Sequence, residues 1–294
     1  MDQKEFESLR KYVSTPYGEI GYVEKGSGPV ALFVHGVLLN GYLWRDAIDA
    51  LSDVRRCVAL DLLGHGGTRA RPDADTTFAG QAKMLNAFVD ALGAGQVDIV
   101  ANDTGGGVSQ IFAAEHPEKI RSLTLTNCDC HDNYPPEALK PLVAAAESGG
   151  LGAIGKMWLG DKNVLRHSFG VAYEDVNAIP DERADFYLKP IFDSEENTGL
   201  VARLIQTPNS QNVSIEAKLK QVKAPALIMW GDDDVFFDKK WAYWLKDTLP
   251  NARGPVIIEG GRLFWPEERP EFFAGEVRKF WASVDAKTVA EARA

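Results

Sequence analysis

The sequence predicts an α/β protein with a mostly parallel central sheet, helices on both faces and an inserted helical cap. Short β-branched apolar runs alternate with segments of helical periodicity as far as residue 127. The alternation then breaks, and helical pieces rich in aromatic residues replace the strands until it resumes at residue 224. We therefore expect a core domain of residues 1–130 and 219–294, with a cap domain of residues 131–218.

The elements follow one another in a regular order. Strands are expected at residues 10–25 (as a pair), 30–34, 55–62, 97–101, 122–127, 224–230 and 255–259. Helices are expected at residues 44–52, 77–93, 108–116, 238–248 and 267–283, and the polar tail from residue 285 is expected to fray. Strands that alternate with helices in this way form a parallel sheet.

Composition narrows the class of partner. The 294 residues are 45% apolar, and 32 basic against 42 acidic residues give a net charge of −10. This charge argues against nucleic acid and anionic membranes as partners, so we expect a small-molecule substrate and a monomer or homodimer. Three cysteines, no signal-like N-terminus and no long apolar run predict a cytoplasmic protein.

The chemistry centres on residues 97–107, which read VDIVANDTGGG. A buried strand here turns abruptly into a helix, and such a turn needs small residues beside it. Gly105 and Gly106 provide that room. Asp103 then stands at the apex of a tight turn, exposed at the carboxyl edge of the sheet.

Four landmarks occur in the expected order and strand context. They are His35-Gly36, Asp61-x-x-Gly64-His65-Gly66, Asn102-Asp103-Thr104-Gly105-Gly106 and Gly231-x-x-Asp234. Together they resemble the α/β-hydrolase superfamily over nearly the whole chain, and HGVLLNGYLWRD with Asp at the elbow resembles its haloalkane dehalogenase and epoxide hydrolase branch. Ala101, in place of the usual first glycine, is a mild departure.

The resemblance implies a set of site residues. Asp103 would attack an electrophilic carbon and form an alkyl-enzyme ester, which a His-activated water then hydrolyses. Asp234 would be the acid that orients the His, and the backbone N–H groups of Val37 and Thr104 would form the oxyanion hole. No cofactor is implied.

The position of the catalytic His is occupied by Arg262, in the stretch EGGRLFWPE. An arginine is always protonated and cannot take a proton from water, but its planar fork can pair with two carboxylates. We therefore expect a cluster of Asp103, Arg262 and Asp234 in which the cation favours the charged form of Asp103.

Further candidates surround this cluster. His131 lies just beyond a strand end, where ligands bind in such sheets, and is the candidate substitute base. The pocket is expected to include His35, Asn102, Trp44 and Trp265, although the tryptophans also fit core packing. The stretch CDCHD at 128–132 lacks zinc spacing, so no metal is expected.

The departures also narrow the substrate. The side chains of Val37 and Thr104 have no N–H donor for a halide, and the tyrosines at 173 and 187 could activate an epoxide or simply pack. The leading hypothesis is an atypical enzyme acting on a small apolar carbon–halide, epoxide or ester. The alternatives are a lyase or isomerase with Asp103 as general base, and a sensor that has lost catalysis.

Overall fold

The structure, a computed structural model, describes residues 1–177 and 179–291. The strands are β1 (Arg10–Thr15), β2 (Gly18–Lys25), β3 (Val30–Val34), β4 (Arg56–Leu60), β5 (Arg69–Ala70), β6 (Val97–Asp103), β7 (Ile120–Cys128), β8 (Ala226–Gly231) and β9 (Ala252–Ile258). The described strands form one sheet in the order β1-β2-β4-β3-β6-β7-β8-β9, with β5 paired to β2. β2 pairs antiparallel with β1, β4 and β5, and the remaining pairs are parallel. The predicted fold class is confirmed.

Helices occupy most of the connections between these strands. The α-helices are α1 (Gln3–Ser8), α2 (Arg45–Leu51), α3 (Phe78–Ala91), α4 (Thr104–Glu115), α5 (Lys140–Glu147), α6 (Leu151–Gly160), α7 (Lys162–Ser168), α8 (Asp181–Phe192), α9 (Glu195–Ile205), α10 (Ser210–Ser214), α11 (Glu216–Leu219), α12 (Lys240–Thr248), α13 (Trp265–Glu268) and α14 (Pro270–Glu291). Short 3-10 turns are η1 (Gly41–Trp44), η2 (Pro117–Lys119), η3 (Glu137–Leu139) and η4 (Gly170–Ala172).

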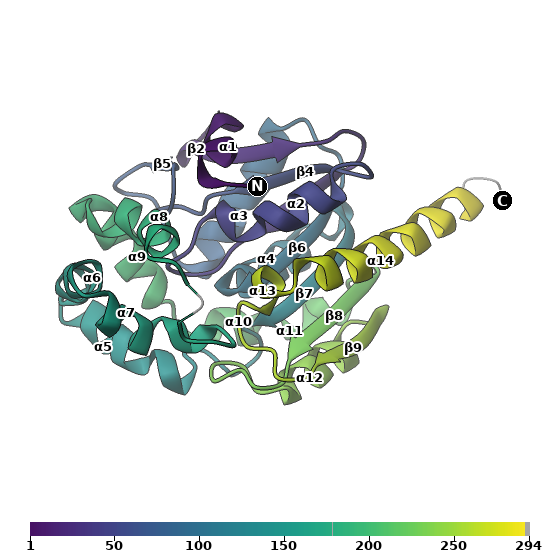
Figure 1. Cartoon of the computed structure of the whole chain (residues 1–294). Coiled ribbons are helices and arrows are strands. Elements are labelled where there is room, and N and C mark those ends of the chain that lie inside the picture. Colours follow the sequence, from purple (N-terminus) through teal and green to yellow (C-terminus); the bar gives the residue numbers. More distant parts are fainter. Residues whose placement is uncertain (178, 292–294) are drawn as a thin grey trace.

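The direction of the crossovers decides which face each helix covers. The chain moves from β3 to β4 in one direction along the sheet and from β6 to β7 in the other. Because such crossovers are right-handed, α2 and α4 lie on opposite faces. Helix α14 packs on α2, and α3 packs on α4, so both faces are covered (Figure 1).

The strand order reverses at β3 and β6, which lie side by side in the sheet. Ligands of open α/β sheets bind beyond the carboxyl ends of the strands at such a reversal. His35 directly follows β3 and Asp103 is the last residue of β6, so the topology brings the first and third sequence landmarks together.

Helices α5 to α9, which follow β7, gather at the opposite end of the molecule from the end of α14 (Figure 1). Between β7 and β8 the described residues form helices and turns but no strand, and α10 and α11 contact α4. No helix among the described residues has the length and apolar character needed to cross a membrane.

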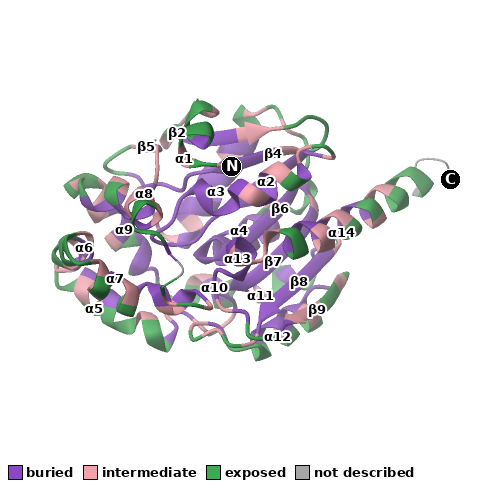
Figure 2. Cartoon of the chain, viewed as in Figure 1, coloured by how far each residue is buried: buried purple, intermediate pink, exposed green. Residues whose placement is uncertain are grey.

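Several elements differ from the sequence expectations: helix α1 was not predicted, and the helix expected at 267–283 is divided into α13 and α14. The short strand β5 carries no apolar run and was not predicted. Helix α14 continues to Glu291, so the expected fraying from residue 285 is wrong for the described part of the tail. Ala, Lys and Glu in this tail are strong helix formers, and the outer turns of α14 are largely exposed (Figure 2).

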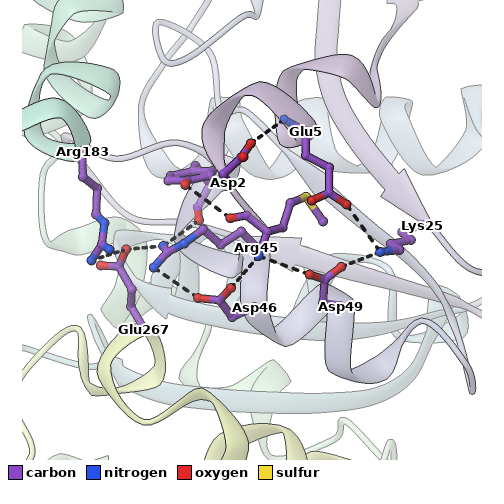
Figure 3. Close-up of polar contacts among 10 residues, drawn as sticks. Asp2, Glu5, Lys25, Arg45, Asp46, Asp49, Arg183 and Glu267 are labelled. Atoms are coloured by element: carbon purple, nitrogen blue, oxygen red, sulfur yellow. Dashed lines mark hydrogen bonds and ion pairs between the residues drawn. The ribbon is translucent and has the colours of Figure 1, made fainter.

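A buried carboxylate connects the core to the region between β7 and β8. The Glu267 side chain is fully buried and forms an ion pair with Arg45 of α2, with Arg183 of α8 at 3.5 Å (Figure 3). It also accepts hydrogen bonds from the hydroxyl groups of Tyr173, at 2.8 Å, and Tyr187, at 2.7 Å. Both tyrosines are buried and bound to Glu267, so of the two roles considered for them the structure agrees with packing and not with activation of an epoxide.

Candidate active site

The turn between β6 and α4 has the backbone strain that its sequence predicts. Asp103 has φ 55° and ψ −138°, a conformation that non-glycine residues rarely adopt. The glycines that follow allow the approach of α4: a Cβ at Gly105 would lie 2.3 Å from the His35 carbonyl oxygen, and one at Gly106 would lie 2.3 Å from Cys128 Cβ. The turn therefore depends on its glycines.

The Asp103 carboxylate lies in a buried pocket made by backbone groups. The N–H groups of Thr104 and Val37 hydrogen-bond to it, as expected for the two donors of an oxyanion hole. A Cβ at Gly36 would fall 2.0 Å from Asp103 Oδ2, so only glycine leaves room for this carboxylate. Burial raises the pKa of Asp103 to about 7; the two N–H groups oppose this rise and the charge of Asp234 adds to it.

Asp234 follows β8 and faces the same region. Its Oδ2 accepts a hydrogen bond of 2.7 Å from Asn127 Nδ2, and its Oδ1 accepts one of 2.9 Å from the Phe236 N–H. Burial raises the pKa of Asp234 to about 7, against the effect of these hydrogen bonds. Two neighbouring carboxyls that both titrate near neutrality are candidates for acid–base work.

Asn127 is a structural clamp that the sequence analysis did not recognise. Besides holding Asp234, its side chain donates to the Gly231 carbonyl at 3.0 Å and accepts from the Gly231 N–H at 2.8 Å. Its Oδ1 also accepts from Trp265 Nε1 at 3.1 Å. One buried amide thus fixes the ends of two strands and the loop before α13.

Arg262 does not join the two carboxylates as expected. Its Nε donates to the exposed Asp233 at 3.0 Å and its Nη1 to the Tyr173 carbonyl at 3.3 Å, and the described ion pairs include none between Arg262 and Asp103 or Asp234. The next residue, Leu263, takes the position that lines the cavity. Arg262 also lowers the pKa of Asp234, but its effect is the smallest of those that act on this carboxyl.

His131 is also directed elsewhere. Its Nδ1 lies 3.3 Å from Glu216 Oε2, and its ring stacks on Trp244 with centroids 4.8 Å apart. It is not among the described residues that line the cavity at Asp103. The expectation that it serves as the substitute base is therefore corrected, because its strand-end position turns the ring towards α11 and α12.

His35 and Asn102 support the site without lining it. His35 accepts the Leu62 N–H at Nε2, at 3.0 Å, and its Nδ1 lies 2.7 Å from the Gly36 carbonyl, while burial lowers its pKa. Its neutral ring thus fixes the oxyanion loop. Asn102 donates to the Leu263 carbonyl at 3.0 Å. The assignment of both residues to the pocket is corrected.

Trp44 and Trp265 belong to the core. Trp44 packs against Phe33 and Phe273, with centroids 5.7 and 5.6 Å apart, and is 1% exposed. Trp265 also packs on Phe273 and is fully buried. Neither lines the cavity, so the expectation that they wall it is wrong. Both tryptophan side chains point towards Phe273 of α14, and the local sequence around each tryptophan does not specify where that helix packs.

A cavity of about 320 Å³ opens above Asp103. Apolar side chains from the core and from the helices after β7 form most of its wall; the aromatic ones are Trp158, Phe169, Phe236, Phe237 and Phe264. Among the described lining residues, those with an ionisable side chain are Asp103 and Asp129. No group of three or more His, Cys, Asp or Glu side chains in the described parts of the chain is arranged to hold a metal ion. The cavity suits a small, largely apolar ligand.

Comparison with known proteins agrees with the fold. Residues 29–153 match the family described as alpha/beta hydrolase fold. A crystal structure of a haloalkane dehalogenase from Bradyrhizobium elkani superposes with a TM-score of 0.81 at 22% identity, covering 95% of this chain and 99% of that one. The chain has the α/β-hydrolase fold.

Two curated relatives are similar in sequence. A cis-3-alkyl-4-alkyloxetan-2-one decarboxylase of Shewanella oneidensis is 26% identical over 276 residues, which cover 89% of this chain and 85% of the relative. A haloalkane dehalogenase of Mesorhizobium japonicum is 38% identical over 105 residues, 35% of this chain and 34% of that protein. The chain thus has a hydrolase-type fold with dehalogenase-like neighbours.

Proposed function

We propose that the protein is an enzyme in which Asp103 attacks a small, neutral, largely apolar electrophile and forms an alkyl-enzyme ester. The observation that carries this proposal is the position of Asp103. Its backbone is strained, and its carboxylate is held by two backbone N–H groups at the floor of an apolar cavity. A fixed nucleophile beside oxyanion donors is the arrangement that covalent catalysis requires.

The charge of the site restricts the substrate. Asp234 raises the pKa of Asp103 and Asp103 raises that of Asp129, so a further anion beside Asp103 would be repelled. The side chains of Val37 and Thr104 have no N–H donor, which disfavours a halide leaving group. We therefore assign an electrophile whose leaving atom is oxygen. An epoxide, or a strained lactone attacked at its oxygen-bearing carbon, gives the alkyl ester, whereas an activated ester would instead give a mixed anhydride of Asp103.

A second candidate is a lyase, and one observation favours it: no imidazole is among the described residues that line the cavity. Attack of Asp103 on the oxygen-bearing ring carbon of an oxetan-2-one would break that C–O bond and release a carboxylate. Loss of carbon dioxide would supply the electron pair of a new C=C bond and expel the Asp103 carboxylate. This cycle needs no water, and a relative bears the name of such a decarboxylase.

Product analysis in water enriched in heavy oxygen separates the two candidates. An epoxide, an oxetan-2-one and an activated ester of similar chain length are the probes. Hydrolysis through an ester of Asp103 places heavy oxygen in the peptide that contains Asp103 after several turnovers, whereas the lyase yields an alkene and leaves the peptide unlabelled. Absence of products from all three probes would contradict both candidates.

Arg262 takes no part in proton transfer in this proposal. The Arg262→Gln variant is expected to alkylate at a rate within about threefold of the wild type and to change the free energy of unfolding by less than about 1 kcal/mol, because the partner Asp233 is exposed. Asp233→Asn is the matched control. A loss of roughly tenfold or more in alkylation for Arg262→Gln alone would instead place Arg262 in the reaction.

A further inference from the structure

Asp129 is a buried carboxyl beside the nucleophile. It follows β7, is 1% exposed and lines the same cavity as Asp103. Its N–H donates to the Asp103 carbonyl at 3.4 Å, which fixes the two backbones against each other. A Cβ at Gly107 would lie 3.0 Å from Asp129 Cβ, so the third glycine of the turn makes room for this residue.

The Asp129 side chain lacks a full set of partners. Its Oδ1 is buried and has no hydrogen-bond partner among the described residues. Buried carboxyl oxygens are normally paired, and an unpaired one in the wall of a cavity indicates a ligand or water that completes it. The Thr104 side chain supplies the hydrogen bond that the carboxyl does have.

The surroundings of the two carboxyls determine which one holds a proton. Two carboxylates in one apolar cavity repel each other, so the pair retains a proton that a solvated pair would lose. Asp103 receives two backbone N–H groups, which favour its charged form. Burial and the neighbouring Asp103 raise the pKa of Asp129 well above its usual range. The pair therefore contains an ionised Asp103 and a protonated Asp129.

We propose that Asp129 is a second catalytic carboxyl, which protonates the leaving oxygen while Asp103 attacks and afterwards takes a proton from the hydrolytic water. This inference rests on the function proposed above. It gives the site an acid and a base where Arg262, His131 and the tyrosines at 173 and 187 are directed elsewhere. Among the described lining residues, Asp129 is the one ionisable group besides the nucleophile.

The steps balance for an epoxide. Asp103 Oδ bonds to a ring carbon, the C–O bond breaks, and the oxygen takes the proton of Asp129. Water then adds to Asp103 Cγ and gives one proton to the Asp129 carboxylate, while the N–H groups of Val37 and Thr104 face the oxyanion. Collapse expels the alcohol oxygen, which takes the remaining proton of the added hydroxyl. Asp103 is again ionised and Asp129 protonated.

The inference separates substrates by their leaving group. An epoxide oxygen needs a proton to leave, whereas bromide does not. General acid catalysis typically contributes about 10²- to 10⁴-fold, so the need for Asp129 is confined to oxygen leaving groups and to ester hydrolysis. A role that is only structural would affect both leaving groups alike.

The wild-type protein has a pH dependence that follows from this assignment. Alkylation by an alkyl bromide is expected to rise as pH increases through about 7, where Asp103 ionises. Epoxide opening is expected to fall at higher pH, where Asp129 loses its proton. Asp103 raises the pKa of Asp129, and Asp234 raises the pKa of Asp103. The titratable groups that in turn respond to the charge of Asp129 are Cys128, Cys130 and Tyr134.

The test compares Asp129→Asn with the wild type, using an alkyl bromide and the epoxide of the same chain length. We expect bromide alkylation within about threefold of the wild type, an alkyl-enzyme that persists, and epoxide opening slowed by about 10²-fold or more. Asp132→Asn, which removes an exposed carboxyl nearby, is the matched control. Thermal unfolding checks that each variant is folded.

One set of outcomes would overturn the role of Asp129, and a different outcome would overturn the role of Asp103 on which it rests. Epoxide opening by Asp129→Asn at the wild-type rate, or equal losses with bromide and epoxide, would refute the role of Asp129 while leaving Asp103 as the nucleophile. If Asp129→Asn does not fold, parallel pH profiles for the two probes in the wild type would refute the role. Absence of an adduct with either probe in the wild type and in Asp129→Asn would refute the nucleophile itself.

Discussion

The Asp103→Asn variant is expected to be more stable than the wild type at alkaline pH and to have nearly the same stability in acid. The pKa of this carboxyl is 3.8 when unperturbed and about 7 in the fold, so the folded protein binds more protons than the unfolded chain in that window. The wild type therefore loses stability as pH rises from about 4 to 7. A pKa difference of this size corresponds to roughly 4 kcal/mol, and the uncharged amide avoids this loss.

Urea unfolding at pH 5 and pH 8 measures this effect. We expect the advantage of Asp103→Asn to reach roughly 2 to 4 kcal/mol at pH 8 and to be much smaller at pH 5. Asn tolerates positive φ better than most residues, so the turn itself should form. Asp233→Asn removes an exposed carboxyl as a control. If the unfolding free energy of Asp103→Asn exceeded that of the wild type by the same amount at pH 5 and pH 8, burial would not be destabilising the carboxylate.

The Glu267→Gln variant is expected to lose roughly 3 to 5 kcal/mol of stability. Glu267 is fully buried and neutralises Arg45, which is itself 6% exposed. Removal of one partner of a buried pair leaves an uncompensated charge, and this costs far more than the pair contributes. Tyr173 and Tyr187 would also lose the carboxylate that accepts hydrogen bonds from their hydroxyl groups. Asp46, 3.2 Å from Arg45, offsets only part of the change.

Chemical unfolding of Glu267→Gln beside Glu271→Gln provides the comparison. Glu271 is exposed on the first turn of α14, and its substitution should alter stability by no more than about 0.5 kcal/mol. Equal effects of the two substitutions would mean that the Glu267 contacts contribute nothing specific. If the helices between β7 and β8 unfold in a separate, earlier transition while the midpoint of the core transition is unchanged, the effect of Glu267→Gln lies in those helices.

The centre of the sheet was predictable because its strands β3, β6 and β8 are buried on both faces. The apolar runs at β3, β6 and β8 stand out against the polar turns that follow them, and their order determines the switch point. Asp103 was predictable for the same reason, since a strand, three glycines and a helix specify the turn locally. β5 escaped prediction because two residues on an edge need no apolar pattern.

The rest of the site depends on side-chain direction, which local sequence does not determine. Arg262 and Leu263 are adjacent, yet only Leu263 turns into the cavity, because Asp233 and the Tyr173 carbonyl draw the guanidinium outwards. His131 was chosen for its strand-end position, but the ring faces Trp244. Asp129, two residues earlier, has the same strand-end signal and is the residue that lines the cavity.

The most direct test of Asp103 as a nucleophile is the mass of the intact protein after exposure to an alkyl bromide and an epoxide. We predict that Asp129→Asn, in which the ester is not cleared by hydrolysis, gains the mass of one alkyl group, that adding Asp103→Asn to this variant abolishes the gain, and that adding Asp233→Asn does not. Peptide mapping should place the group on Asp103. Equal labelling with and without the Asp103→Asn substitution, or no labelling of either the wild type or Asp129→Asn with either reagent, would contradict the proposal.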